Sequence, residues 1–187
     1  MGSNNTKISR IYHGSDVLFT TIDLNMCKSN KDFGKGFYTT ENYDIAKAWA
    51  LRHALQHRSG HAYVYMLYVD MDDLKKRFNV HEFRDSIAWV DYIIFNRDNT
   101  NNFIKNTYKN YDVVIGKIAD ARTQLIIQKF CKEFMGVKPT DEEKMELVRK
   151  LTAFDLKDQI CFKSNRVIEY IQSKQPNGRL SVQEVYR

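Results

Sequence analysis

Two short segments combine glycine with polar and aromatic side chains, a mixture suited to gripping a flat, polar ligand. The first is the segment 12–15 (YHGS), and the second is the segment 34–40 (GKGFYTT). The imidazole of His13 offers one hydrogen-bond donor and one acceptor. In the second segment, two glycines flanked by aromatic residues indicate a close backbone turn that feeds a short strand. Either segment alone is weak evidence, because a histidine at a strand end is commonly structural and a tyrosine commonly belongs to the core.

Motifs of other enzyme classes are missing from the sequence. It contains no HExxH, GxSxG, GxGxxG or Walker phosphate loop, which argues against zincin, hydrolase, Rossmann and P-loop classes. The DFG triplet at 32–34 resembles a kinase motif, but the other kinase motifs are missing and the chain is too short for that fold. His53, His57 and His61 have spacing suited to metal binding, but no cysteine or carboxylate joins them at a useful spacing. We therefore predict no metal site.

The composition predicts one folded domain in a reducing compartment. The 187 residues are 43% hydrophobic and 13% aromatic, enough for a sizeable core. The three cysteines form no CxxC pair, and no apolar stretch reaches the roughly 18–20 residues that span a bilayer. Residues 1–10 lack the apolar core of a signal peptide, so we expect a cytoplasmic protein without a membrane partner. The net charge of +6 fits either a lysine-rich soluble surface or a nucleic-acid partner.

Helices between short strands are expected to position the two segments, which is an α+β pattern with mixed sheets. A weakly alternating strand over 8–12 ends at His13. Thr40 is predicted as the N-cap of a helix that runs to about Arg58. Thr140 and Glu143 have the spacing of a capping box. The other predicted elements are strands over 62–69, 111–116 and 158–163, helices over 83–96, 123–134 and 165–173, and a turn or short helix over 72–78.

With both segments in this order, the chain resembles the ADP-ribosyltransferase superfamily, in the branch with a His-Tyr-Glu triad. In that branch a strand histidine lies in a YHG-like motif, and a tyrosine follows in a G-x-G-F/I-Y segment. The chain is similar to a family of small bacterial domains that carry YHGS followed by DFGxGFYxT. The similarity continues through YDVVIG at 111–116, IADxRT at 118–123 and QIxF at 159–162. It implies a fold of two split mixed sheets with flanking helices and NAD in the cleft between the sheets.

The resemblance implies roles for residues of both segments. His13 would hydrogen-bond the adenosine ribose of NAD, and Gly14 would let the ligand approach the backbone closely. Tyr38 would stack on the nicotinamide ring and hold it where its glycosidic bond breaks. Phe37 would point toward the core, because neighbours on a strand face opposite ways. The implied NAD-binding set is completed by Ser15 and Thr39, as hydroxyl contacts, and by Gly36.

The strand at 158–162 departs from the family pattern at the position of the glutamate. Loss of nicotinamide builds positive charge on the ribose, which the glutamate stabilises while it orients the ribose 2′-hydroxyl. Gln159 takes that position here, and its amide holds a hydroxyl without supplying charge. The change favours transfer of a single ADP-ribose over chain elongation and leaves reduced or lost activity open. A one-residue slip would instead place Asp158 there and aim Gln159 away.

The implied reaction transfers ADP-ribose from NAD to a macromolecular acceptor, a protein or a nucleic acid. Its predicted catalytic residues are His13, Tyr38 and Gln159. Arg122 would contact the NAD pyrophosphate bidentately, and the alternative is an ordinary ion pair. Bacterial enzymes of this kind include toxins, some of them paired with antitoxins or serving phage defence. An NAD glycohydrolase, a non-catalytic NAD- or nucleotide-binding module and a basic nucleic-acid-binding protein remain alternatives.

Overall fold

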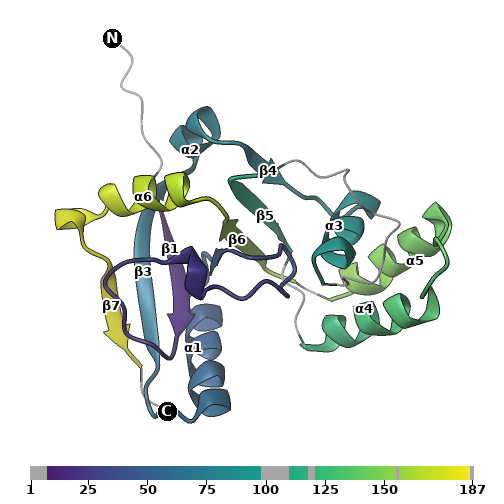
Figure 1. Ribbon diagram of the computed structural model, residues 1–187, viewed down its shortest axis with the longest axis horizontal. Helices are drawn as coiled ribbons and strands as arrows, with labels where there is room; N and C mark the ends of the chain where they lie inside the picture. The colour runs from purple at the N-terminus through teal and green to yellow at the C-terminus, as the bar shows by residue number, and fades with distance from the viewer. Residues whose placement is uncertain (1–7, 98–109, 118–120, 155, 186–187) are drawn as a thin grey trace.

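Two small β-sheets packed face to face form the centre of the computed structural model (Figure 1). The structure describes residues 8–97, 110–117, 121–154 and 156–185. The first sheet is antiparallel and has the strand order β1 (Ile8–Ser15), β3 (Tyr63–Asp70), β7 (Ser181–Glu184). The second has the order β2 (Phe37–Thr39), β6 (Asp158–Phe162), β5 (Val113–Lys117), β4 (Val80–Glu82), and its β4–β5 pair is parallel. The mixture of helices and mixed sheets confirms the predicted α+β class.

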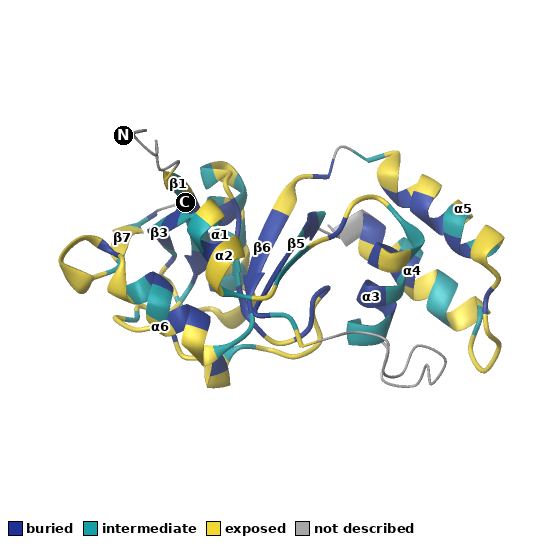
Figure 2. Cartoon of the chain, turned by 90° about the horizontal axis from the view of Figure 1, so that it is seen from above, coloured by how far each residue is buried: buried dark blue, intermediate teal, exposed yellow. Residues whose placement is uncertain are grey.

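Helices cover the outer face of each sheet, and Figure 2 shows a group of helices beside the second sheet. Helix α1 (Tyr43–His57) packs on the first sheet. The outer face of the second sheet packs against α3 (Ile87–Arg97), α4 (Ala121–Glu133) and α5 (Asp141–Thr152). The other helices of the described residues are α2 (Met71–Arg77), α6 (Asn165–Ser173) and 3-10 turns at Leu24–Met26 and Pro176–Gly178. Within the described residues, no helix has both the length and the hydropathy that crossing a membrane requires.

The main core lies between the two sheets. Ile11 and Leu67 face it from the first sheet, and Val113 and Phe162 face it from the second; all four side chains are fully buried. Val167 of α6 joins the same cluster. Each such side chain contributes about 1.5–3 kcal/mol when it leaves water. This apolar layer fixes the distance between the sheets and therefore the positions of the strands that carry the predicted site.

Strand β1 reaches the second sheet through main-chain hydrogen bonds at one position. The amide of Tyr12 donates to Thr40 O at 2.7 Å, and the amide of Thr40 donates to Tyr12 O at 2.9 Å. Thr40 directly follows β2, so this pair joins the edges of the two sheets. It places His13 of β1 beside Tyr38 of β2.

The long connection between β1 and β2, residues 16–36, passes over the inter-sheet core (Figure 1). Two hydrogen bonds attach it to the first sheet and to α6. The amide of Phe19 donates to Tyr65 Oη at 2.6 Å, and the amide of Ile22 donates to Gln172 Oε1 at 2.7 Å. The connection therefore covers the edge of the core at which His13 lies.

Several boundaries differ from the sequence predictions. The N-cap of α1 is Asn42 and not Thr40, because the Thr40 main chain is used to pair with Tyr12. The helix predicted over 83–96 begins only at Ile87: β4 ends at Glu82, and the amide of Phe83 still donates to Ile115 O of β5 at 2.8 Å. The strand β7 and the Leu24–Met26 turn were not predicted. The capping box at Thr140 is confirmed, with Glu143 bonded in both directions.

Helix α1 lies so close to β1 that only glycine fits at position 14. A Cβ atom there would lie 2.0 Å from Ala46 O and 2.7 Å from Ala50 N, both main-chain atoms of α1. The helix makes this approach possible by facing the strand with alanines. Gly14 therefore has a packing role in the fold, and the close neighbour on this side of the strand is a helix.

Replacing Gly14 by alanine is expected to lower the free energy of unfolding by about 3 kcal/mol, because a main-chain clash relaxes only by moving the helix. Gly60→Ala is the matched control: a Cβ there meets nothing within 4 Å, and only its φ of +75° is unfavourable for alanine. That variant should lose about 1 kcal/mol. Urea unfolding of both proteins measures the difference. Equal losses would contradict the close packing of α1 on β1.

Candidate functional site

His13 lies at the edge of the inter-sheet core, among aromatic rings. Its ring centroid is 4.2 Å from that of Phe37, and the rings of Phe19 and Tyr65 also contact it. His13 Nδ1 donates to the carbonyl oxygen of Tyr38 at 2.7 Å. Burial lowers the pKa of His13 to about 4, so the ring is neutral near pH 7. Because the carbonyl is only an acceptor, Nδ1 carries the proton and Nε2 is left as an acceptor.

Tyr38 points to the opposite face of the second sheet, toward α3 and α5. Its hydroxyl accepts from the amide of Phe33 at 2.9 Å and donates to Gly34 O at 2.7 Å. Its ring lies nearly parallel to that of Phe33, with the centroids 6.4 Å apart. Burial raises the pKa of Tyr38 well above its ordinary value, so the hydroxyl stays a neutral donor. The turn at 32–34 therefore occupies the surroundings of the tyrosine.

Gln159 lies on the same face of the second sheet as Tyr38, and only 3% of it is exposed. Its Nε2 donates to Asp32 Oδ2 at 3.0 Å and to Lys117 O at 3.3 Å. Among the described residues, none donates a hydrogen bond to Gln159 Oε1. Asp158, the carboxylate that a one-residue slip would select, is exposed and points to the other face of the strand.

Asp32 was not predicted as a site residue, yet it is the buried carboxylate nearest to Gln159. It is 5% exposed, and its Oδ1 accepts from Arg97 Nε at 2.6 Å in an ion pair with that residue. Its Oδ2 faces Gln159. The signal for it was present in the sequence, since Asp32 opens the DFG triplet that leads into Gly36 and Tyr38. The triplet also opens the DFGxGFYxT motif of the resemblance, in which no role was predicted for Asp32.

The other predicted NAD-binding residues are used by the fold. Phe37 is buried in the inter-sheet core, as its position next to Tyr38 predicts. Thr39 is fully buried and its hydroxyl donates to Ile160 O at 3.2 Å, while Ser15 Oγ accepts from the amide of Val17 at 3.0 Å. A Cβ on Gly36 would lie 2.4 Å from Cys161 Sγ. The side chain of Arg122 lies outside the described residues.

The three predicted catalytic residues are connected through the Tyr38 carbonyl and the turn at 32–34. They do not line one open pocket. His13 contacts Tyr38 only through the Tyr38 carbonyl, from the inter-sheet side. Tyr38 and Gln159 share the other face, and both bond to the turn at 32–34. Lys163 also holds this turn, because its Nζ donates to Phe33 O. The turn is thus the common partner of the strands that carry the site.

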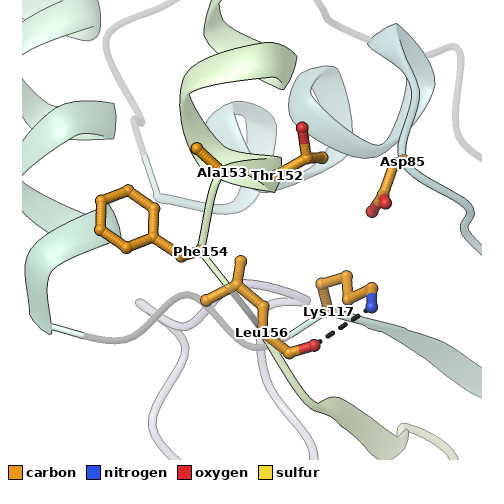
Figure 3. Close-up of a pocket in the computed structure, with 6 residues that line it drawn as sticks. All are labelled: Asp85, Lys117, Thr152, Ala153, Phe154 and Leu156. Carbon is orange, nitrogen blue, oxygen red and sulfur yellow. Dashed lines mark hydrogen bonds between the residues drawn. The ribbon is translucent and has the colours of Figure 1, made fainter.

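A cavity of about 350 Å³ lies at the end of β5, where Lys117 is one of its lining residues (Figure 3). Its lining residues are Asp85, Lys117, Thr152, Ala153, Phe154 and Leu156. The side chain of Lys117 crosses it to donate to Leu156 O at 3.1 Å. The main chain of Lys117 accepts from Gln159, so one residue links this cavity to the predicted site. Among the described residues, no predicted site residue lines the cavity.

Comparison with known proteins gives a match to one family. A family model described as "Protein of unknown function (DUF3990)" matches residues 9–173. The matched range includes His13, Asp32, Tyr38 and Gln159. A search of curated proteins and a search of solved structures give no match.

His13 should make the protein less stable in mild acid. The unfolded imidazole titrates near pH 6.5 and the folded one at about 4, so the unfolded chain binds the proton more readily. The stability that the neutral ring gives is complete above about pH 7 and is lost as the pH falls toward 4. His13→Gln keeps an amide donor for Tyr38 O but does not titrate in this range.

Between pH 7 and pH 4.5 the wild type should therefore lose roughly 2 kcal/mol more than His13→Gln, which urea unfolding at each pH measures. His53 and His81, whose pKa values burial also lowers, are present in both proteins and cancel in the comparison. Parallel losses in the two proteins would show that His13 does not titrate in this way.

Proposed function

The chain belongs to the DUF3990 family, and for this member we propose an NAD-dependent mono-ADP-ribosyltransferase activity on a macromolecular acceptor, a protein or a nucleic acid. The site would lie where β1, β2 and β6 meet, around His13, Tyr38 and Gln159. The activity would need no metal.

One observation carries the proposal: side chains from three distant parts of the chain join one connected network. His13 is bonded to the main chain of Tyr38, and Tyr38 and Gln159 are both bonded to the turn at 32–34. The two segments that carry the resemblance lie on adjacent strands at the junction of the sheets.

The chemistry of the network suits the two riboses of NAD. Ribose hydroxyls are hydrogen-bond donors that need acceptors when they leave water. The neutral ring of His13 leaves Nε2 as an acceptor, and Gln159 keeps Oε1 as one. We assign Nε2 to the adenosine ribose and Oε1 to the 2′-hydroxyl of the nicotinamide ribose.

Tyr38 would act through its ring, stacked on the nicotinamide. In the present arrangement Phe33 and Gly34 hold its hydroxyl, so these two residues must move, while Asp32 keeps its bonds to Arg97 and Gln159, before a ligand reaches the ring. The hydroxyl bonds of Tyr38 thus belong to the ligand-free arrangement. The ring of Tyr38 would thus bind the ligand, while its hydroxyl holds the ligand-free turn. Substitution by phenylalanine or alanine separates these two roles.

In the reaction, the bond between ribose C1′ and the nicotinamide nitrogen breaks, and its electron pair leaves with neutral nicotinamide. A nucleophilic atom of the acceptor bonds to C1′ and gives its proton to solvent. Gln159 would hold the 2′-hydroxyl while positive charge develops on the ribose. Because its amide carries no charge, a single transfer is favoured over chain elongation.

Nicotinamide release from NAD by the purified protein, with and without cell lysate or RNA, tests the proposal. Tyr38→Ala should lower the rate at least about 100-fold, because the stacking ring positions the bond that breaks. Tyr38→Phe keeps the ring and should stay within about tenfold of the wild type. Tyr43→Ala, at a partly buried tyrosine of α1 outside the network, is the matched control and should leave the rate unchanged.

Release that requires lysate or RNA, with label from NAD appearing on protein or nucleic acid, is the expected result. Release into water alone would make the protein an NAD glycohydrolase. No release under any condition, together with no NAD binding by calorimetry, would overturn the proposal. A defect in Tyr38→Ala shared by Tyr43→Ala would indicate a loss of folding instead of a loss of the site.

A further inference from the structure

The two carboxylate oxygens of Asp32 bond to different side chains. Arg97 takes Oδ1, through an Nε bond of 2.6 Å and the ion pair, and Gln159 Nε2 bonds to Oδ2 at 3.0 Å. Asp32 is 5% exposed and Gln159 is 3% exposed, so water does not substitute freely for either partner. The three side chains come from the connection 16–36, from α3 and from β6.

This arrangement leaves one orientation for the amide of Gln159. Asp32 Oδ2 and Lys117 O are both acceptors, so the group that faces them must be the NH₂ group. The amide oxygen consequently points to the other side. These two acceptors therefore determine the orientation of the Gln159 amide. Of the two, Asp32 is a carboxylate and Lys117 O is a main-chain carbonyl.

We propose that Asp32 is a positioning residue of the site, which acts through Gln159 by holding its amide so that Oε1 faces a ribose hydroxyl. The inference rests on the proposed function. Asp32 and Gln159 would together replace the glutamate of the His-Tyr-Glu triad that the chain resembles. The aspartate supplies the carboxylate, and the glutamine supplies the acceptor atom.

The same contacts explain why position 159 carries an amide. A glutamate there would put an anionic oxygen beside Asp32 Oδ2 and Lys117 O, where Nε2 now donates to both. Two carboxylates at this distance do not both stay ionised without an added cation or proton. Gln159 is therefore matched to Asp32, and its departure from the family pattern is compensated within the chain.

The effect of Asp32→Asn follows from the donors of Arg97. A guanidinium has only donors, so it would claim the amide oxygen of the new asparagine. The asparagine NH₂ would then face Gln159, whose amide would turn to accept from it. Gln159 Oε1 would be used inside the protein and would no longer reach the ribose hydroxyl.

Exchanging the two groups, with the amide at position 32 and the carboxylate at position 159, restores an acceptor oxygen for the ribose hydroxyl. In Asp32→Asn with Gln159→Glu, the asparagine oxygen accepts from Arg97 and its NH₂ donates to one carboxylate oxygen of the glutamate. The second carboxylate oxygen is left for the ribose. The double variant thus keeps a single carboxylate in the pair and reverses the direction of its hydrogen bond.

The experiment is a double-mutant cycle on nicotinamide release by the full chain, with kcat and KM for NAD measured separately. Each single variant should lower kcat about 10- to 100-fold while KM changes less than about threefold, because the lost bond orients the reacting ribose. The double variant should recover at least tenfold over the poorer single variant. Thermal melts confirm that each protein is folded.

Asp91→Asn is the matched control for loss of a poorly exposed, ion-paired carboxylate. Asp91 lies on α3, as Arg97 does, and pairs with Lys144 at 2.9 Å outside the network. This variant should melt at a lower temperature and keep the wild-type kcat. If Asp32→Asn alone does not fold, the comparison of Gln159→Glu with the double variant carries the test.

Three results overturn the inference while the wild type remains active: a kcat within threefold in Asp32→Asn, a rise in KM with kcat unchanged, or no recovery in the double variant. Any of them would make Asp32 a structural partner of Arg97. A wild type that releases no nicotinamide under any condition instead overturns the proposed function, and this inference with it.

Discussion

The main-chain bonds between Tyr12 and Thr40 are the constraint on which the rest of the site depends. They hold the edge of the first sheet against the edge of the second, and the inter-sheet core sets the angle of approach. His13 follows Tyr12 and Tyr38 precedes Thr40 by two residues, so their neighbourhood is a consequence of this pairing. Because these bonds join main-chain atoms, side chains next to the junction can be replaced without breaking it.

The second organising feature is a buried carboxylate. Removing a charge from water is costly unless hydrogen bonds and an opposite charge replace the solvent. Asp32 meets this requirement with Arg97 on one oxygen and Gln159 on the other. The turn that carries Asp32 also binds Tyr38 and Lys163. One turn of the long connection thus ties helix α3 to strands β2 and β6.

The junction and the buried carboxylate both lie within the part of the chain that matches the family. The matched range 9–173 covers the junction, the turn and Gln159. Within it, an acceptor nitrogen on His13, an aromatic ring on Tyr38 and an acceptor oxygen on Gln159 form the chemical basis of the proposed ADP-ribosyl transfer. Lys117 lines the cavity, and its carbonyl oxygen accepts a hydrogen bond from Gln159. Strands β5 and β6 therefore carry both the cavity and the proposed site.

Local patterns were enough to predict many elements. The α+β class, the strands that carry His13, Tyr38 and Gln159, and the capping box at Thr140 follow from residue periodicity and cap chemistry, which act over a few residues. The same local rules failed at Thr40, predicted as a helix N-cap, and at Phe83, predicted as the first residue of a helix. There, pairing with β1 and with β5 claims main-chain groups that a helix would otherwise use.

The sequence by itself determined which residue types are available at positions 13, 38 and 159, and that they lie on strands. Only the tertiary structure decided how they face: His13 between the sheets, Tyr38 and Gln159 on the outer face of the second sheet. It also decided that Gly14 serves the packing of α1 and that Asp32 belongs with Gln159. The reason is separation along the chain. Asp32 and Gln159 are 127 positions apart, so no local pattern signals their contact, which long-range packing of the two sheets and α3 brings about.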